Sequence, residues 1–102
     1  MSEPLKAAFI FIAPEADPAK DRQWVKTPMV HLLAVGVSNY DQAAALAKEL
    51  VQKEGIGAIE LCGGFGTLGT AKIAASVKVP VGVVRFDIHP GLGNASGDTL
   101  FV

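Results

Sequence analysis

The segment GAIELCGGFGT, residues 57–67, decides the fold of this chain. Its first half, residues 57–62, is a short and mostly apolar run, which is typical of a buried strand. The glycines that come next form a tight turn, and Thr67 can cap a helix running to about residue 77. A strand that leads directly into a helix is the repeating unit of α/β proteins with parallel sheets.

The same alternation extends outward from this segment. Short apolar runs predict four strands, at residues 6–12, 29–37, 57–62 and 81–86. A second helix is predicted between the second and third strands. Asn39 and Gln42 fit a capping box at its start, and Gly55 marks its end. In the polar connection 14–28, Asp17 and Pro18 predict a short helix to about Trp24.

These elements predict one α/β domain spanning residues 1–102. Its order is β-(short α)-β-α-β-α-β, a four-stranded, mostly parallel sheet with flanking helices, like a fragment of a Rossmann or flavodoxin-type fold. The alternative is an α+β domain in which the second strand is antiparallel, because the 14–28 connection need not be a crossover helix. The glycine-rich tail, residues 87–102, ends in apolar residues and is expected to dock on its own domain or on a neighbour.

Composition points to self-association. Half of the 102 residues are hydrophobic, only 19% are charged, and the mean hydropathy is +0.37. A small domain with so few charges predicts an apolar surface buried against another copy, with a dimer favoured. The single cysteine favours a cytoplasmic location. A net charge of −1 argues against nucleic acid as a partner, and no apolar run is long enough to predict a membrane span.

The rule that ligands bind beyond the carboxyl ends of parallel strands selects two stretches, Cys62–Thr67 and Asp87–Gly91. The glycine turn leads into a helix N-terminus, where free N–H groups attract anions. We therefore expect a small carboxylate or phosphate metabolite there, with an enzymatic role left open and no cofactor assigned. The expected ligand-binding residues are Gly63, Gly64, Phe65, Gly66, Thr67, Arg85 and Asp87, with His89 completing the pocket.

Two further interpretations concern the same turn. Gly64, Gly66 and Gly69 spell G-x-G-x-x-G between a strand and a helix, which suggests a nucleotide or flavin. A tight turn also needs glycine for its own geometry, so the pattern can be purely structural. The competing class of function is a non-catalytic structural or regulatory oligomer.

Cys62 and His89 are the candidate catalytic residues. A thiol at a helix start can become a nucleophile, and His89 could act as its base. The plainer reading is that Cys62 is a small buried hydrophobic side chain. A weaker alternative is a metal held by Cys62, Asp87 and His89.

Glu60 and Arg85 lie in otherwise apolar strands, where a lone charge is costly. If their faces coincide, the two charges meet below the glycine turn. Arg85 is then part of a structural ion pair, or it clamps an anionic ligand.

Nearly the whole chain resembles a family of small bacterial proteins catalogued as a domain of unknown function. The resemblance implies a single-domain protein and brings no activity or catalytic residue. It rests on residues 6–13, 58–66 and 79–87 and on His89-Pro90-Gly91.

Overall fold

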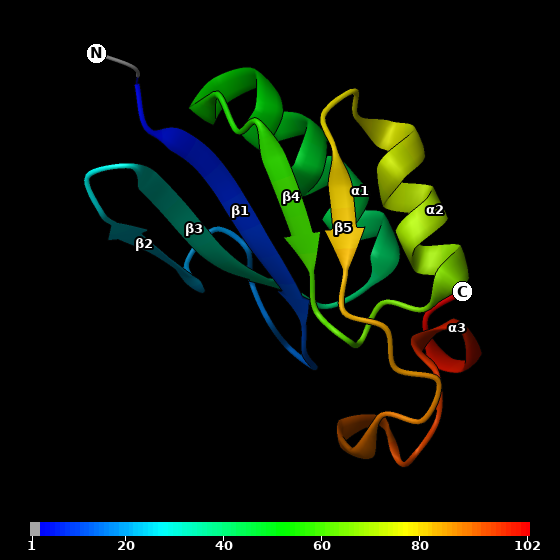
Figure 1. Cartoon of the computed structure of the whole chain (residues 1–102). Coiled ribbons are helices and arrows are strands. Elements are labelled where there is room, and N and C mark those ends of the chain that lie inside the picture. Colours follow the sequence, from blue (N-terminus) through cyan, green and yellow to red (C-terminus); the bar gives the residue numbers. More distant parts are fainter. Residues whose placement is uncertain (1–2) are drawn as a thin grey trace.

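A computed structural model describes residues 3–102 as one mixed sheet with helices packed on it (Figure 1). The strands lie in the order β2-β3-β1-β4-β5, and every neighbouring pair is parallel except β2 with β3. The predicted α/β class and mostly parallel sheet are therefore confirmed, and the sheet also contains one antiparallel strand. The strands are β1 (Leu5–Ile12), β2 (Arg22–Lys26), β3 (Val30–Val37), β4 (Ala58–Leu61) and β5 (Val81–Val83).

The antiparallel strand is β2, for which the sequence predicted a short helix. Asp17 does begin a turn, since its carboxylate accepts a hydrogen bond from the Ala19 N–H at 2.9 Å. The chain then extends from Arg22 because pairing with β3 brings Trp24 against the core. A single isolated helical turn would be unstable in water. The predicted helix is therefore wrong, the sheet has five strands instead of four, and β3 itself runs parallel to β1.

The first long helix follows its predicted capping signals, whereas the predicted Thr67 cap of the second is wrong. Helix α1 (Tyr40–Glu49) starts at Asn39, whose side chain accepts a hydrogen bond from the Gln42 N–H at 2.7 Å. It continues as the π-helical turn η1 (Leu50–Glu54) and stops at Gly55, which adopts a left-handed φ of 71°. Helix α2 (Thr67–Ser76) comes after β4 as predicted, but Thr67 is the first residue of that helix, and its N-cap is Gly66, which makes no side-chain capping bond. No helix in residues 3–102 is long and apolar enough to cross a membrane.

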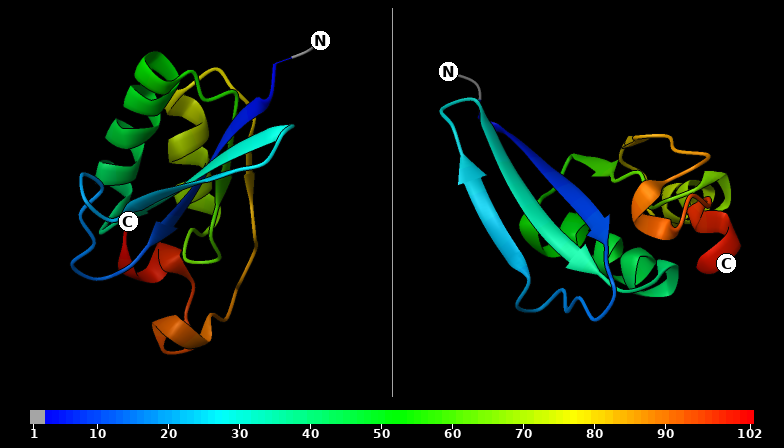
Figure 2. Two further views of the ribbon diagram at one scale, coloured as in Figure 1. Left: turned by 90° about the vertical axis from the view of Figure 1, so that its left-hand side faces the viewer. Right: turned by 90° about the horizontal axis from the view of Figure 1, so that it is seen from below.

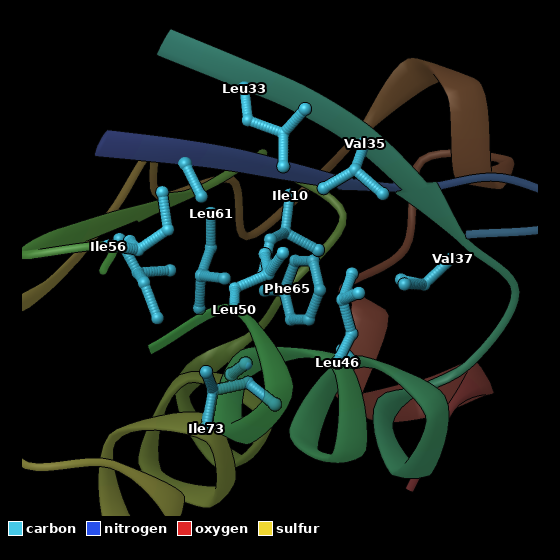
Figure 3. Close-up of a cluster of buried hydrophobic side chains, with 14 of the residues drawn as sticks. Ile10, Leu33, Val35, Val37, Leu46, Leu50, Ile56, Leu61, Phe65 and Ile73 are labelled. Carbon is cyan, nitrogen blue, oxygen red and sulfur yellow. The ribbon is translucent and has the colours of Figure 1, made fainter. Parts of the chain in front are cut away.

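Both long helices cover the same face of the sheet (Figure 2). Alternate residues of β1, β3 and β4 point into this single layer of core, where they meet the apolar faces of α1 and α2 (Figure 3). Phe65, from the glycine turn, lies in the middle of the core and is buried. The fully enclosed side chains include Ile10, Leu33, Val35, Val37, Leu50, Ile59, Leu61 and Ile73.

The opposite face of the sheet carries no helix (Figure 2). The ladder registers place alternate residues of all five strands on it. Hereafter it is called the open face. Its residues are Leu5, Ala7, Phe9, Phe11, Gln23, Val25, Val30, Leu32, Ala34, Gly36, Ala58, Glu60 and Gly82.

The tail is more structured than predicted. Strand β5 ends at Val83 instead of residue 86, and the chain continues with a 3-10 turn, η2 (Pro90–Leu92), and a short helix, α3 (Gly97–Leu100). The tail folds back beneath the carboxyl end of the sheet (Figure 1). Its Phe101 ring lies 5.6 Å from the ring of Tyr40, centroid to centroid. The tail therefore docks on its own domain, one of the two expected outcomes.

Candidate ligand-binding site

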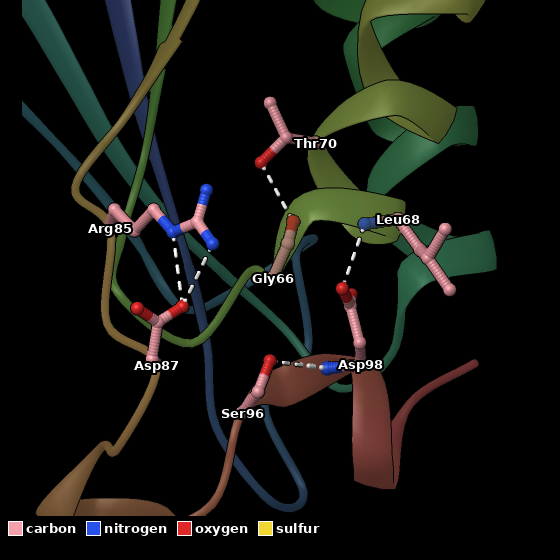
Figure 4. A network of polar contacts seen from close by, with 7 residues as sticks. All are labelled: Gly66, Leu68, Thr70, Arg85, Asp87, Ser96 and Asp98. Atoms are coloured by element: carbon pink, nitrogen blue, oxygen red, sulfur yellow. Dashed lines mark hydrogen bonds and ion pairs between the residues drawn. The ribbon is translucent and has the colours of Figure 1, made fainter.

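The N-terminus of α2 is capped by the carboxylate of Asp98, a residue near the C-terminal end of the described chain (Figure 4). Asp98 Oδ2 accepts a hydrogen bond from the Leu68 N–H at 2.9 Å, and Oδ1 accepts one from the Gly69 N–H at 3.1 Å. Ser96, the N-cap of α3, accepts a hydrogen bond from the Asp98 N–H and so holds this residue in place. The chain thus supplies its own anion at the helix start, where free N–H groups and the helix dipole favour negative charge.

Tyr40 ties the same carboxylate to the glycine turn. Its hydroxyl donates to Asp98 Oδ1 at 3.1 Å and accepts from the Gly66 N–H at 3.0 Å. Burial is the main cause that raises the pKa of Tyr40 to about 12, and the Asp98 charge adds to it. Burial also acts to raise the pKa of Asp98. The N–H groups of Leu68 and Gly69 and the Tyr40 hydroxyl outweigh burial and lower that pKa.

Close packing within the chain accounts for the glycines of the turn. A Cβ at Gly66 would clash with the Asp98 carboxylate, and a Cβ at Gly69 would clash with the Tyr40 ring. Gly63 lies in the same way against the ring of Phe86. A Cβ at Gly64, the first glycine of the G-x-G-x-x-G spacing, would clash with the Ile12 side chain. The spacing therefore has a structural explanation in this fold, because a side chain at Gly64, Gly66 or Gly69 would displace β1, the tail or α1.

A cavity of about 340 Å³, the β5 cavity, lies beside this cap, between the segment after β5 and the first turns of α2. Arg85 and Asp87 form an ion pair on its wall, with Arg85 Nε and Nη2 each 3.0 Å from Asp87 Oδ1 (Figure 4). Both side chains are largely exposed, at 68% and 74%. The lining residues are Phe65, Gly66, Thr67, Thr70, Ala71, Val83, Arg85, Phe86, Asp87 and Ser96.

The polar groups of the β5 cavity are mainly hydrogen-bond donors. The Arg85 guanidinium has five N–H groups and uses only some of them on Asp87. The Ser96 hydroxyl accepts from Asp98 and keeps its own proton for a further partner. Thr67 adds an exposed hydroxyl, whereas the Thr70 hydroxyl already donates to the Gly66 carbonyl at 2.9 Å. Together with the apolar wall, this arrangement suits an amphipathic anion.

A second cavity of about 570 Å³, the β1 cavity, lies at the carboxyl ends of β1 and β4. Cys62 and His89 both line it, but no hydrogen bond joins them. The Cys62 sulfur accepts hydrogen bonds from the N–H groups of Ile12 and Gly64, both at 3.3 Å. His89 Nδ1 accepts the Gly91 N–H at 3.0 Å, so this nitrogen is not free to act as a base here. The other lining residues are Ile12, Ala13, Pro14, Gly64, Gly91, Leu92, Leu100 and Phe101.

The structure thus divides the predicted site between two cavities. The β5 cavity receives Phe65, Gly66, Thr67, Arg85 and Asp87, and the β1 cavity receives Cys62, Gly64 and His89. Gly63 is buried under Phe86. Within residues 3–102 no three His, Cys, Asp or Glu side chains lie close enough to hold a metal, so the alternative metal set is not assembled.

The expected pairing of Glu60 with Arg85 is wrong. Glu60 is opposite Gly82 in the ladder, which puts it on the open face. Val83 is opposite Leu61 on the core side, and Arg85 lines the β5 cavity together with Val83. The two strands are neighbours as predicted, but Glu60 lies on the open face, whereas Arg85 lies beyond the end of β5, on the side of α2, and pairs with Asp87.

Sequence reasoning missed Tyr40, Thr70, Ser96 and Asp98. Ser96-Gly97-Asp98 does carry a local signal, a helix N-cap with an acidic residue in the first turn. Thr70 could have been found from its place one turn after Thr67. Nothing local links Asp98 to a helix that starts 31 residues earlier, because that contact depends on how the tail folds back.

Comparison with known proteins identifies the family of this chain. The model of a family described only as a family of unknown function (DUF6506) matches residues 5–99. No curated protein and no solved structure matches the chain.

Proposed function

Since the chain belongs to DUF6506, a family of unknown function, we propose its function from geometry: the β5 cavity binds a small metabolite with an anionic head and an apolar body. The head is a carboxylate or a phosphate. It lies beside the Gly63–Thr67 turn instead of on it, because Asp98 already occupies the N–H groups of Leu68 and Gly69.

The observation that carries this proposal is Arg85. Its guanidinium lies on the cavity wall, and its partner Asp87 is even more exposed than Arg85 itself, at 74% against 68%. Ion pairs between exposed groups contribute only ~0–1 kcal/mol. An incoming anion can therefore replace Asp87 or use the remaining N–H groups, whereas a fully buried ion pair would resist such an exchange.

The cavity also limits the size and character of the ligand. Its volume of about 340 Å³ is near the lower end of the ~300–1,000 Å³ range of ligand pockets. This favours a small metabolite over a dinucleotide. The walls contributed by Phe65, Val83 and Phe86 suit a short hydrocarbon or aromatic body next to the charged head.

Calorimetry with matched probes tests the proposal. Benzoate, hexanoate and phenyl phosphate represent the ligand class, and benzyl alcohol is the neutral comparison. We expect the anions to bind and Arg85→Met to weaken them by about ten- to a hundredfold, the range that loss of a charge-assisted hydrogen bond gives. Lys78→Met removes the same charge beyond the far end of α2 and should leave binding unchanged.

Two results would contradict this assignment. One is equal binding of benzoate and benzyl alcohol, which would show that the negative charge of the ligand does not contribute to its affinity. The other is equal binding to Arg85→Met and the wild type, which would move the site away from the β5 cavity. The second candidate function, a structural oligomer, is favoured by a different observation, the open face of the sheet.

A further inference from the structure

The open face is almost entirely apolar, although no helix within residues 3–102 covers it. The exposed fractions of Leu5, Val25 and Val30 are 50%, 56% and 39%. The polar side chains on this face are Gln23 on β2 and Glu60 on β4. Such a continuous apolar surface is typical of a contact face.

The whole molecule exposes more surface than its size requires. Its accessible surface is 5978 Å² for a mass of 10.6 kDa. A compact monomer of that mass exposes about 5,500 Å². The molecule is also elongated, with extents of 45 × 24 × 21 Å. In Figure 2, the β2–β3 hairpin projects past the helices, and its Val25 and Val30, both on the open face, are among the exposed large apolar side chains.

We propose that the open face is the interface of a symmetric dimer, in which two copies pack face to face. The two-fold axis runs parallel to the strands, between β1 and β3. Rotation about this axis places β1 of one copy over β3 of the other, and β4 of one copy over β2 of the other. Positions along the strands are kept, so residues on one level of the ladder meet residues on the same level.

The ladder registers show that this arrangement matches large side chains with small ones. Phe9 is paired with Ala34, and Ala7 is paired with Leu32, so in the dimer Phe9 lies over Ala34 of the other copy and Leu32 over Ala7. Val25 and Ala58 share the level of Ala7 and Leu32, so they also face each other across the dimer. This interdigitation is what closely packed sheets need.

The polar residues fit the same axis. Gln23 and Glu60 both lie on the level of Phe9, with Gln23 two strands to one side of β1 and Glu60 one strand to the other. Rotation brings Gln23 of each copy over Glu60 of the other, where the amide can donate to the carboxylate. Within one chain they are three strand spacings, about 14 Å, apart and do not touch.

A charge-swap cycle tests this interface by sedimentation equilibrium. Glu60 is exposed and Gln23 lies on the edge strand, so substitutions at either should leave the fold intact. Gln23→Glu places two carboxylates opposite each other twice per dimer and should raise the dimer dissociation constant on the order of tenfold. Adding Glu60→Lys should restore it to about the wild-type value or below, because the new carboxylate and the new ammonium group then pair across the interface. Gln52→Glu, exposed on η1, is the matched control and should change nothing.

The rescue is diagnostic because residues 23 and 60 are too far apart to interact within one chain. A wild type that stays monomeric throughout the micromolar range would overturn the proposal and leave the open face to a different partner. The interface would lie on another surface if Gln23→Glu left the dimer dissociation constant unchanged. The same would follow if the double variant did not recover the wild-type dissociation constant. None of these results bears on the Arg85 test, so the two proposals fail independently.

Discussion

At the scale of single residues, Tyr40 and Asp98 join three segments that are distant in the sequence. Tyr40 begins α1, its hydroxyl accepts from the turn before α2, and Asp98 belongs to α3. The buried Tyr40 hydroxyl satisfies the Gly66 N–H, which would be costly to leave unpaired. This pair, more than any ionic contact at the surface, fixes the shape of the turn on which the β5 cavity is built.

The pKa of Tyr40 can be measured directly because it is the only tyrosine of the chain. We expect the absorbance of tyrosinate to appear with a midpoint near pH 12, about two units above an exposed tyrosine. In Asp98→Ala the midpoint should fall, since the neighbouring negative charge is gone. It should not reach the exposed value, because burial is the larger cause. A wild-type midpoint near 10, with the circular dichroism still that of the folded protein, would contradict this burial.

Removal of the Asp98 carboxylate should destabilise the protein at neutral pH. Asp98→Ala takes the cap from α2, and we expect a loss of about 1 kcal/mol in the free energy of unfolding. Because folding lowers the pKa of Asp98, its contribution is present above the unfolded pKa of about 3.9 and is lost as the pH falls through the folded value. The difference between variant and wild type should therefore shrink in acid.

Urea unfolding at several pH values checks both parts of that expectation. Asp87→Ala is the control, since its ion pair with Arg85 is exposed and should contribute little. An Asp98→Ala variant as stable as Asp87→Ala at pH 7 would show that the carboxylate does not hold the helix start.

At the scale of elements, the close packing of α2 on α1 depends on the absence of a side chain at Gly69. A Cβ at Gly69 would overlap the Tyr40 ring, which is buried and packs against the rings of Phe65 and Phe101. Gly69→Ala gains up to ~1 kcal/mol of helix propensity. We expect overpacking, which costs roughly 1–3 kcal/mol, to exceed this gain.

Thermal unfolding of Gly69→Ala, compared with that of Gly82→Ala, shows whether the steric clash at Gly69 outweighs the gain in helix propensity. Nothing lies within 4 Å of a Cβ at Gly82, so that variant should unfold close to the wild-type temperature. A Gly69→Ala protein that is more stable than the wild type would mean that α1 and α2 can separate without loss.

Local signals explain which elements the sequence predicted correctly. Asn39, Gln42 and Gly55 act within α1 and its extension, and the predicted start and end of that helix are confirmed. Asp17 is also a true local signal, but it forms only a turn. The strand after that turn is decided by β3, a partner further along the chain, and by the place for Trp24 on the core. No pattern within residues 17–26 contains that information.

At the scale of the whole molecule, the position of the cavities could be predicted but their separation could not. Both lie at the carboxyl ends of the strands, as the rule for parallel sheets requires. The prediction placed Cys62 and His89 in one site with Arg85 because no local pattern in the sequence indicated how the tail folds. In the observed fold, Phe86 and His89 of the tail pack against Gly63, and their ring centroids are 4.7 Å apart. These two rings separate the β5 cavity from the β1 cavity, where the sequence predicted a single pocket.

The cap of α2 also orders events during synthesis. All five strands and both long helices are complete by residue 83, whereas Ser96 and Asp98 come later. A nascent chain can therefore assemble its sheet and core while the start of α2 still lacks its carboxylate. The β5 cavity, which needs Ser96, Arg85 and Asp87 for its wall, acquires its final form only after these residues have left the ribosome.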